Sequence, residues 1–188
     1  MSDWSAALEE AYASAPADEF VIQTLELIHP AFVDENDAAD SVRIVLDGRD
    51  WDLTLEEGAP LFGGQTKTFQ ALAMEVTMPE QVEGQMGSIK MALDNVPRSV
   101  WPKLQAAARV RASALVIYRE WVAVRDLVNG IYTPSPAPDM VLGDLTMKVV
   151  SATVLRVEGM ASFVDLLNKG FPRSTFSREH YPGLFGGA

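Results

Sequence analysis

The sequence contains no cysteine and only two histidines, His29 and His180. Without cysteine the chain can form no disulfide, no thiolate nucleophile and no sulfur-ligated metal site. The two histidines are far apart and lack the spacing of a zinc-binding pair. Glycine-rich phosphate-binding loops and the G-x-S-x-G turn of hydrolases are also missing. These absences leave few routes to catalysis, so we expect a protein that is not an enzyme and needs no cofactor or metal.

Long apolar runs and basic residues are scarce as well. No stretch reaches about 18 apolar residues, so we expect no membrane insertion. The first residues, MSDWSAALEEAY, do not pair a basic region with an apolar one, so we expect no secretory signal. The chain has 15 Lys and Arg against 26 Asp and Glu, a formal net charge of −11. Because phosphate binding depends on Lys and Arg, we expect no specific nucleic-acid binding.

The sequence is rich in short segments of β-branched, aromatic and other apolar residues. Such segments predict strands within 20–28, 42–55, 68–78, 88–93, 113–125 and 140–158. Asp47-Gly48 predicts a hairpin turn within the second of them. Apolar residues at helical spacing predict helices over 2–14 and 100–110, the second capped by Ser99. Because helices and strands do not alternate, the pattern favours a mainly β fold, an antiparallel β-sandwich or barrel with one flanking helix.

Two groups of acidic residues offer carboxylates for a metal or a reaction. The loop 33–40 lacks the spacing and the glycine of a calcium-binding loop. Its oxygen donors would be Asp34, Glu35, Asn36, Asp37 and Asp40. Asp47, Asp50 and Asp52 flank the predicted hairpin turn and could form paired carboxylates. A solvated loop explains the first group better, and a turn and a polar strand face explain the second, so we assign no catalytic or metal site to either.

The last residues, 166–188, differ from the remainder in charge and in pattern. Lys169, Arg173 and Arg178 stand against Glu179, so this segment sums to +2 and the remainder to −13. Its proline and glycine content disfavours a strand, yet disordered tails rarely carry so many aromatic residues. We expect an irregular arm, anchored by aromatic side chains on a neighbouring subunit or on its own domain. With the first helix, it supplies the interface candidates Trp4, Tyr12, Phe171, Arg173, Phe176, Arg178, Tyr181 and Leu184.

The predicted organisation is therefore an N-terminal helix within 1–16, a β-domain over 17–165 and an arm over 166–188.

Three stretches of the chain resemble a family of small tail proteins of tailed bacteriophages and prophages, catalogued as a domain of unknown function. They are WSAALEEAYASAPADEFVIQTLELIHPAF, IKMALDNVPRSVWPKLQAA and FVDLLNKGFPRSTFSREHYPGL. The ending FPR…F…YPGL is the most specific part. The resemblance implies a minor tail protein of the lambda-like tail tip, with the β-sandwich fold of tail-tube proteins as its expected fold.

The resemblance implies partners and a location as well. The chain would form a ring with itself, a hexamer or alternatively a trimer, in the virion tail tip after synthesis in the host bacterial cytoplasm. Its neighbours would be the tail tube protein, the tape-measure protein and the tail-tip hub proteins, around a conduit for DNA. Truncation after Asn168 would leave a folded monomer that fails to enter tails. The rival functions are a tail-associated cell-wall hydrolase with paired carboxylates and a monomeric ligand-binding β-barrel.

Overall fold

The computed structural model describes residues 6–14, 16, 18–77, 88–94, 100–110, 112–152 and 156–163. Within these ranges the chain forms two helices, α1 (Ala6–Ser14) and α2 (Trp101–Arg109). The strands are β1 (Glu19–Val33), β2 (Ala39–Val45), β3 (Trp51–Thr54), β4 (Thr66–Ala71), β5 (Met74–Thr77), β6 (Ser88–Asp94), β7 (Ala114–Arg125), β8 (Tyr132–Pro134), β9 (Met140–Ala152) and β10 (Arg156–Phe163). The prediction of a mainly β fold with two helices is confirmed. The predicted arm, 166–188, lies outside the described residues.

All these strands belong to one sheet with the order β3-β4-β2-β1-β7-β9-β10-β6-β5, and β8 pairs with β7. The neighbours β2 and β4 are parallel, whereas the other pairs are antiparallel. The expected antiparallel pairing therefore holds for all described pairs except β2 with β4, so the sheet is mixed, and it does not close into a barrel. Only Leu72 and Ala73 separate β4 from β5, so the chain passes directly from one end of the sheet to the other.

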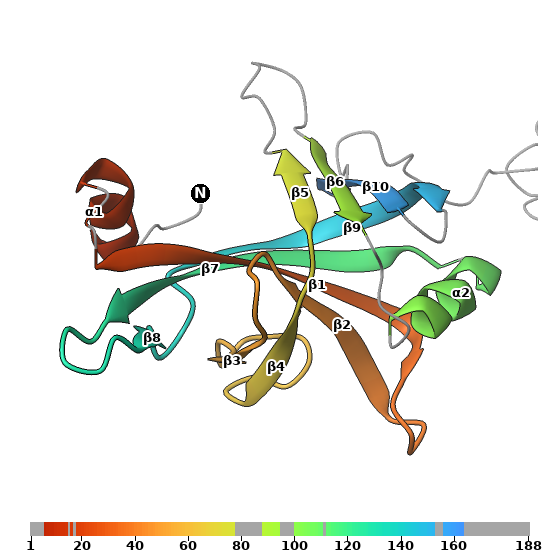
Figure 1. The fold of residues 1–188 in the computed structure, drawn as a ribbon. Coiled ribbons are helices and arrows are strands. Elements are labelled where there is room, and N and C mark those ends of the chain that lie inside the picture. The colour runs from red at the N-terminus through yellow and green to blue at the C-terminus, as the bar shows by residue number, and fades with distance from the viewer. Residues whose placement is uncertain are drawn as a thin grey trace, which may run out of the picture.

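The central strands β2, β1, β7 and β9 carry a different core on each face. On one face, alternate side chains of β1 and β7, including Leu25, Val116 and Tyr118, enter the main core. Side chains from α1, α2, β5, β6 and β10 complete this core. Figure 1 shows β5 and β6 running across the direction of β1 and β7 on this side. The far end of the sheet therefore acts as a second layer over its own centre.

A second, smaller core lies on the opposite face, beneath β3 and β4 (Figure 1). The rings of Phe69 and Trp121 meet edge to face with centroids 5.7 Å apart. The ring centroid of Phe20 lies 5.8 Å from that of Trp51 and 4.8 Å from that of Tyr132. Aromatic pairs at these separations stabilise beyond their buried area. This cluster fixes β3 and β4 onto β1 and β7.

The first strand is longer than the sequence predicts. It continues through Pro30 to Val33, although proline removes a backbone donor. The ladder with β2 is irregular between Ile28 and Val33, which is where a strand tolerates proline. His29 is buried beside it, and its Nδ1 accepts a hydrogen bond from the backbone N–H of Ala31 at 3.0 Å. The histidine thus replaces a backbone acceptor at the irregularity, which is a structural role.

The predicted hairpin at Asp47-Gly48 is wrong, because β2 pairs with β1 and β4 while β3 pairs only with β4. The Asp47 carboxylate accepts hydrogen bonds from the N–H of Gly48 at 2.6 Å and from the indole of Trp51 at 2.5 Å. Trp51 is buried in the second core. Burial of this indole carries the chain away from β2 and onto the other face of the sheet, and that burial outweighs the local turn preference.

Three further boundaries differ from prediction. The ribbon over 140–158 is two strands, β9 and the start of β10, which form an antiparallel pair with an irregularity between Glu158 and Gly159. The segment 68–78 splits into β4 and β5 because each half pairs with a different strand. Val100 rather than Ser99 occupies the N-cap of α2, without a side-chain cap, and Pro102 lies in the first turn.

A buried charged cluster joins β1, β2, β7 and the segment after β3 on the second-core face. The guanidinium of Arg119, on β7, donates to Glu26 Oε2 at 2.6 Å and to both oxygens of Glu56 at 2.7 and 2.8 Å. Glu26 Oε1 accepts the hydroxyl of Ser41 at 2.6 Å. The side chains of Arg119 and Glu26 are fully buried. The cluster therefore fixes the segment after β3 onto the central strands β1, β2 and β7.

A second ionic contact anchors α2 to the start of β2. Lys103 donates to Asp40, and Arg43 donates to Asp40 Oδ1 at 3.2 Å and to the hydroxyl of Ser41 at 2.7 Å. Burial alone would raise the pKa of Asp40. The hydrogen bonds from Lys103 and the backbone of Ser41, with the charges of Arg43 and Lys103, outweigh burial and lower that pKa below its usual value.

Candidate interaction surface

Of the interface candidates predicted from the sequence, Tyr12 alone lies among the described residues. The other candidates, Trp4, Phe171, Arg173, Phe176, Arg178, Tyr181 and Leu184, lie outside them. Tyr12 is on α1, and Leu8 and Ala11 of the same helix are buried in the main core. The ring of Tyr12 remains half exposed. Tyr12 lies at the end of the molecule where α1 meets the sheet, and the predicted interface stays a prediction.

Tyr12 contacts a buried acid on the neighbouring strand. Its hydroxyl donates to Glu120 Oε1 at 3.0 Å, and the hydroxyl of Tyr118 donates to the same oxygen at 2.5 Å. Burial raises the pKa of both tyrosines, and the negative charge of Glu120 raises them further. Glu120 Oε2 is buried without a hydrogen-bond partner among the described residues. Hydrogen bonds therefore add to the apolar packing that holds α1 on β7.

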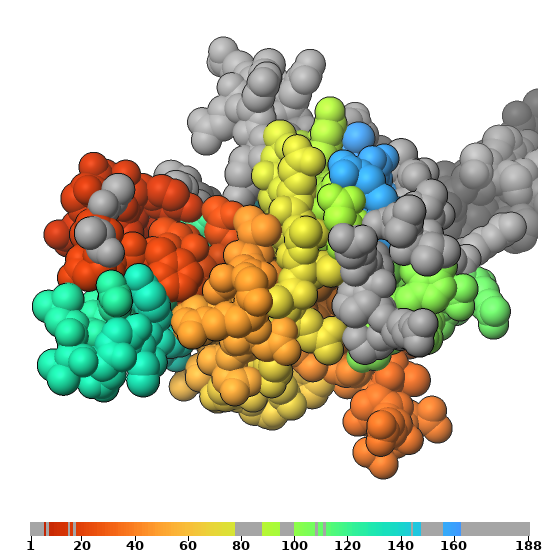
Figure 2. Space-filling model, viewed as in Figure 1, coloured from red at the N-terminus to blue at the C-terminus, as the bar shows by residue number. Residues whose placement is uncertain are grey.

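The sheet narrows beneath α1 to the strands β1, β7 and β8. Glu19 pairs with Val124, and Val124 pairs with Thr133, so one row crosses all three strands. Figure 2 shows this end, where α1 and the start of β1 (red) adjoin the segment around β8 (teal). A groove of about 360 Å³ lies here, and we call it the α1 groove. It is lined by Glu10, Glu19, Val122, Val124, Thr133, Pro134, Ser135 and Asp139.

The α1 groove combines an apolar base with an acidic rim. Val124 is 45% exposed although it lies between two paired strands, because α1 covers only part of this face. Glu10, Glu19 and Asp139 supply carboxylates, and none of the described residues that line the groove is basic. Asp139 is held in place, since its Oδ2 accepts the N–H of Val122 at 2.9 Å and the hydroxyl of Ser135 at 2.6 Å.

An apolar loop, residues 126–131, projects from the same end between β7 and β8. Leu127 and Val128 are 83% and 92% exposed, and Ile131 is also exposed. The loop is nevertheless ordered by Asp126, whose Oδ1 accepts the N–H of Val128 at 2.8 Å and whose carbonyl accepts the N–H of Gly130 at 2.7 Å. Gly130 has φ +69°, which glycine adopts without strain. A preformed loop with exposed aliphatic tips fits a contact with another protein surface.

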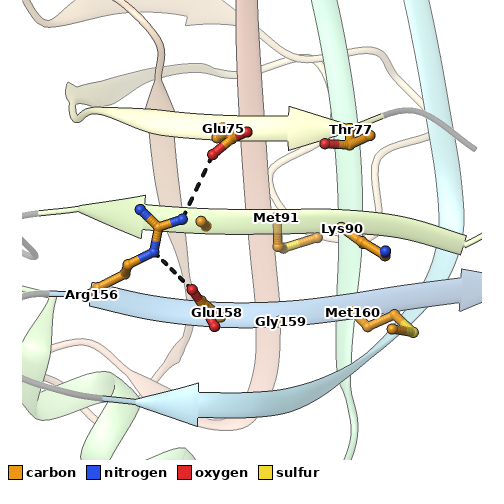
Figure 3. Close-up of a pocket in the computed structure, with 9 residues that line it drawn as sticks. Glu75, Thr77, Lys90, Met91, Arg156, Glu158, Gly159 and Met160 are labelled. Atoms are coloured by element: carbon orange, nitrogen blue, oxygen red, sulfur yellow. Dashed lines mark hydrogen bonds and ion pairs between the residues drawn. The ribbon is translucent and has the colours of Figure 1, made fainter.

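A second recess, of about 320 Å³, lies on the outer face of β5, β6 and β10 (Figure 3). Ala92 lies between the paired residues Glu75 and Glu158. Arg156 reaches both of these carboxylates, at 3.6 Å and 2.9 Å, and also Asp94 at 3.1 Å. The hydrogen bond to Glu158 raises the pKa of Arg156, and the charge of Asp94 adds to the effect. This recess is thus occupied by a cross-strand ion cluster that joins its three strands.

The carboxylates considered for catalysis each make a structural hydrogen bond. Asp50 Oδ1 accepts the N–H of Ala71 at 2.7 Å, and Asp52 Oδ1 accepts the hydroxyl of Thr68 at 2.6 Å. Asp47 binds the indole of Trp51, and in the acidic loop Asp34 Oδ1 accepts the N–H groups of Asn36 and Ala38. Within the described ranges, no three His, Asp or Glu side chains form a group that could hold a metal ion.

Sequence reasoning did not find the α1 groove or the apolar loop. Val124, Glu19 and Asp139 come from three separate strand ends, and no local pattern joins them. The apolar loop did carry a signal, because Leu127 and Val128 immediately precede the Asn129-Gly130 turn, where polar residues are usual. In the part of the chain that the structure describes, no helix is long and apolar enough to cross a lipid bilayer.

Comparison with known families shows which family this mainly β protein belongs to. The chain belongs to the family described as Domain of unknown function (DUF1833), whose model matches residues 7–176. The match includes α2, all of α1 except its first residue and all the described strands, together with part of the predicted arm. No curated protein is significantly similar to the chain.

Proposed function

We propose that this protein is a structural component of the tail tip of a long-tailed bacteriophage. It forms a ring, a hexamer or alternatively a trimer, that joins the tail tube to the hub around the DNA conduit. The three stretches that resemble phage tail proteins support this role, and two of them form α1 with β1 and β6 with α2. Membership of a family whose model matches 7–176 is consistent with a resemblance over most of the chain.

The observation that carries the proposal is the contact surface at the α1 end. The α1 groove and the apolar loop place Val124, Leu127 and Val128 in solvent on one ordered end of the subunit. Exposed aliphatic side chains on a fixed backbone are favourable in an assembly and costly in an isolated molecule. The sheet also ends in β3 and β5, whose outer edges pair with no strand among the described residues. Closed rings cover such edges and surfaces repeatedly.

The charge of the chain fits a DNA conduit. A net charge of −11 repels phosphate, so DNA would slide past the ring without being held. The same charge disfavours contact with an anionic lipid surface. The neighbours of the ring would be the tail tube protein, the tape-measure protein and the hub proteins.

The rival hydrolase function makes a separate prediction. Replacing Asp47, Asp50 and Asp52 by Asn keeps an acceptor oxygen for the bonds of Asp50 and Asp52 and for one of the two bonds of Asp47. The change removes the three carboxylates that the sequence offers as a pair for glycan cleavage. We expect the triple variant to leave particle infectivity within about tenfold of the parent, since surface changes away from a site are mild. Clearing of peptidoglycan by the parent protein, lost in this variant, would contradict the structural role.

Deletion of the gene from the phage tests the proposal itself. We expect deletion to give particles without functional tails, and the full chain supplied in trans to restore them. Mass spectrometry of the restored, purified tails should detect the chain. Tails that assemble and infect normally without the protein would contradict a structural role. A chain that remains monomeric by light scattering and binds a small molecule would favour the ligand-binding alternative.

A further inference from the structure

We propose that the α1 groove is the receptor for the C-terminal segment 166–188 of this same chain. The proposal deepens the tail function, and it rests on that function only for which copy donates the segment. In a ring, the donor would be the neighbouring copy. The groove itself supplies the chemistry for recognition in either case.

The shape of the groove calls for an apolar occupant. Val122 and Val124 lie on β7 with β1 on one side and β8 on the other, and α1 covers only part of this face. Val124, at the base of the groove, is 45% exposed. An aromatic side chain laid across this row would remove it from water. The segment 166–188 carries Phe171, Phe176 and Tyr181.

The charge of the groove calls for a basic occupant. Its rim carries Glu10, Glu19 and Asp139, with no basic residue among the described lining. The chain as a whole is strongly acidic, whereas 166–188 sums to +2 through Lys169, Arg173 and Arg178. Complementary charge steers such an encounter and fixes its orientation. Nucleic acid and anionic lipid carry the wrong charge for this rim.

The end of the described chain also points toward the groove. In the antiparallel pair of β9 and β10, Phe163 lies opposite Leu145. Further residues in the direction of β10 advance toward Met140 and Asp139 on β9. Asp139 lies about 20 Å from Leu145 along the strand, at about 3.3 Å per residue. A segment that begins at residue 166 is therefore within reach of the groove of its own chain.

Disulfide trapping tests the proposal cleanly because the natural chain contains no cysteine. Val124→Cys is made in one full-length protein, and Phe171→Cys, Phe176→Cys or Tyr181→Cys in another carrying an isotope label. The two are mixed and oxidised, and mass spectrometry counts the mixed disulfides. Leu46→Cys, which has a similar exposure of 44% and is not among the residues that line the groove, replaces Val124→Cys as the matched control. We expect at least one segment position to trap Val124→Cys several-fold more than Leu46→Cys.

A double variant with both cysteines in one chain, oxidised at low protein concentration, separates the two donors. A bond between copies supports the groove assignment and the arm exchange expected in a ring. A bond only within one chain supports the groove assignment but counts against arm exchange. Trapping no stronger than the Leu46→Cys control, in both formats and at all segment positions, overturns the inference without touching the tail function.

Charge reversal supplies an independent readout. Glu10→Lys with Glu19→Lys should reduce the trapping several-fold at low salt, because the basic segment then meets a basic rim. Glu57→Lys with Asp52→Lys changes the net charge equally at exposed positions away from the groove and is the control. Equal trapping in both charge variants would overturn the electrostatic part of the recognition.

Discussion

At the scale of single residues, buried charge rather than apolar contact distinguishes this core. Arg119 lies fully buried between Glu26 and Glu56, with each carboxylate within 2.8 Å of the guanidinium. Such a cluster adds little net stability over an apolar replacement, but the loss of one partner leaves uncompensated charge in a dry site. The geometry therefore makes the fold intolerant of changes at Arg119.

We predict that Arg119→Met lowers the free energy of unfolding by about 3–5 kcal/mol, the usual cost of leaving buried charges unpaired. Urea denaturation measures the loss. Arg125→Met, on the exposed end of the same strand, is the matched control and should change stability by less than about 1 kcal/mol. Equal, small losses in both variants would mean that the cluster does not support the fold.

The tyrosines around Glu120 make stability depend on pH in the alkaline range. Burial, and then the hydrogen bond to Glu120 and its charge, raise the pKa of Tyr118 far above its usual value. The unfolded chain releases this proton near its ordinary value of about pH 10, while the folded chain retains it. The stability due to Tyr118 is therefore fully present below about pH 10 and is lost as pH rises above it.

Tyr118→Phe should accordingly flatten the alkaline loss of stability. At neutral pH we expect the variant to be less stable by about 1.5–3 kcal/mol, because a hydrogen bond to a charged group is lost. The difference from the parent should stay constant up to about pH 9 and shrink above about pH 10. Unfolding free energies from urea titrations across this range give the answer. A difference that grows above about pH 10 would contradict the assignment.

The sequence gives only a weak indication that these charged residues are buried. Glu26 lies in TLELIH and Arg119 in VIYREWV, so each interrupts an apolar run. A single chain does not tell which partner lies opposite, since Glu56 comes from a distant segment. The hydroxyl of Tyr12 shows the same limit, because helical spacing places it beside the core but does not reveal Glu120.

At the scale of elements, α1 depends on what it packs against. It has nine residues, which is too short for a stable isolated helix in water. Leu8 is completely buried in the main core, and Tyr12 adds the hydrogen bond to Glu120. The helix also forms one wall of the α1 groove, so its docking controls the proposed contact surface.

We predict that Leu8→Ala destabilises the protein by about 2–3 kcal/mol, within the range for a buried leucine. Exchange of the α1 amide hydrogens should accelerate more than exchange in β7. Glu9→Ala, on the exposed side of the same helix, should leave both quantities nearly unchanged. If Leu8→Ala matches this control, α1 is not part of the main core.

The positions of most elements followed from the sequence, but their partners did not. Apolar alternation located β6 and β7 closely. It misjudged Asp47-Gly48, because the burial of Trp51 against Phe20 draws β3 to the other face of the sheet. The strand predicted within 20–28 continues past Pro30, because the irregular ladder tolerates a proline there. Local propensity predicts where a strand lies in the sequence, whereas its pairing partner and register depend on tertiary contacts.

At the scale of the whole molecule, the protein exposes apolar side chains at one end, where α1 lies. The two cores use most apolar side chains of the central strands, while the α1 end keeps Val124 and the apolar loop in solvent. The acidic rim and the net charge of −11 favour the basic protein partner that we propose over nucleic acid. This combination is consistent with the proposed role as a repeated subunit of a tail ring.

The number of copies in an assembled tail tests that claim most directly. Tails purified from infectious particles can be counted by quantitative mass spectrometry against the tail tube protein, and the ring imaged by electron cryomicroscopy. The account predicts a closed ring with about six copies per tail, or about three in the trimeric alternative, since subunits of closed rings occur in fixed multiples. About one copy per tail, or purified tails that lack the protein, would contradict it.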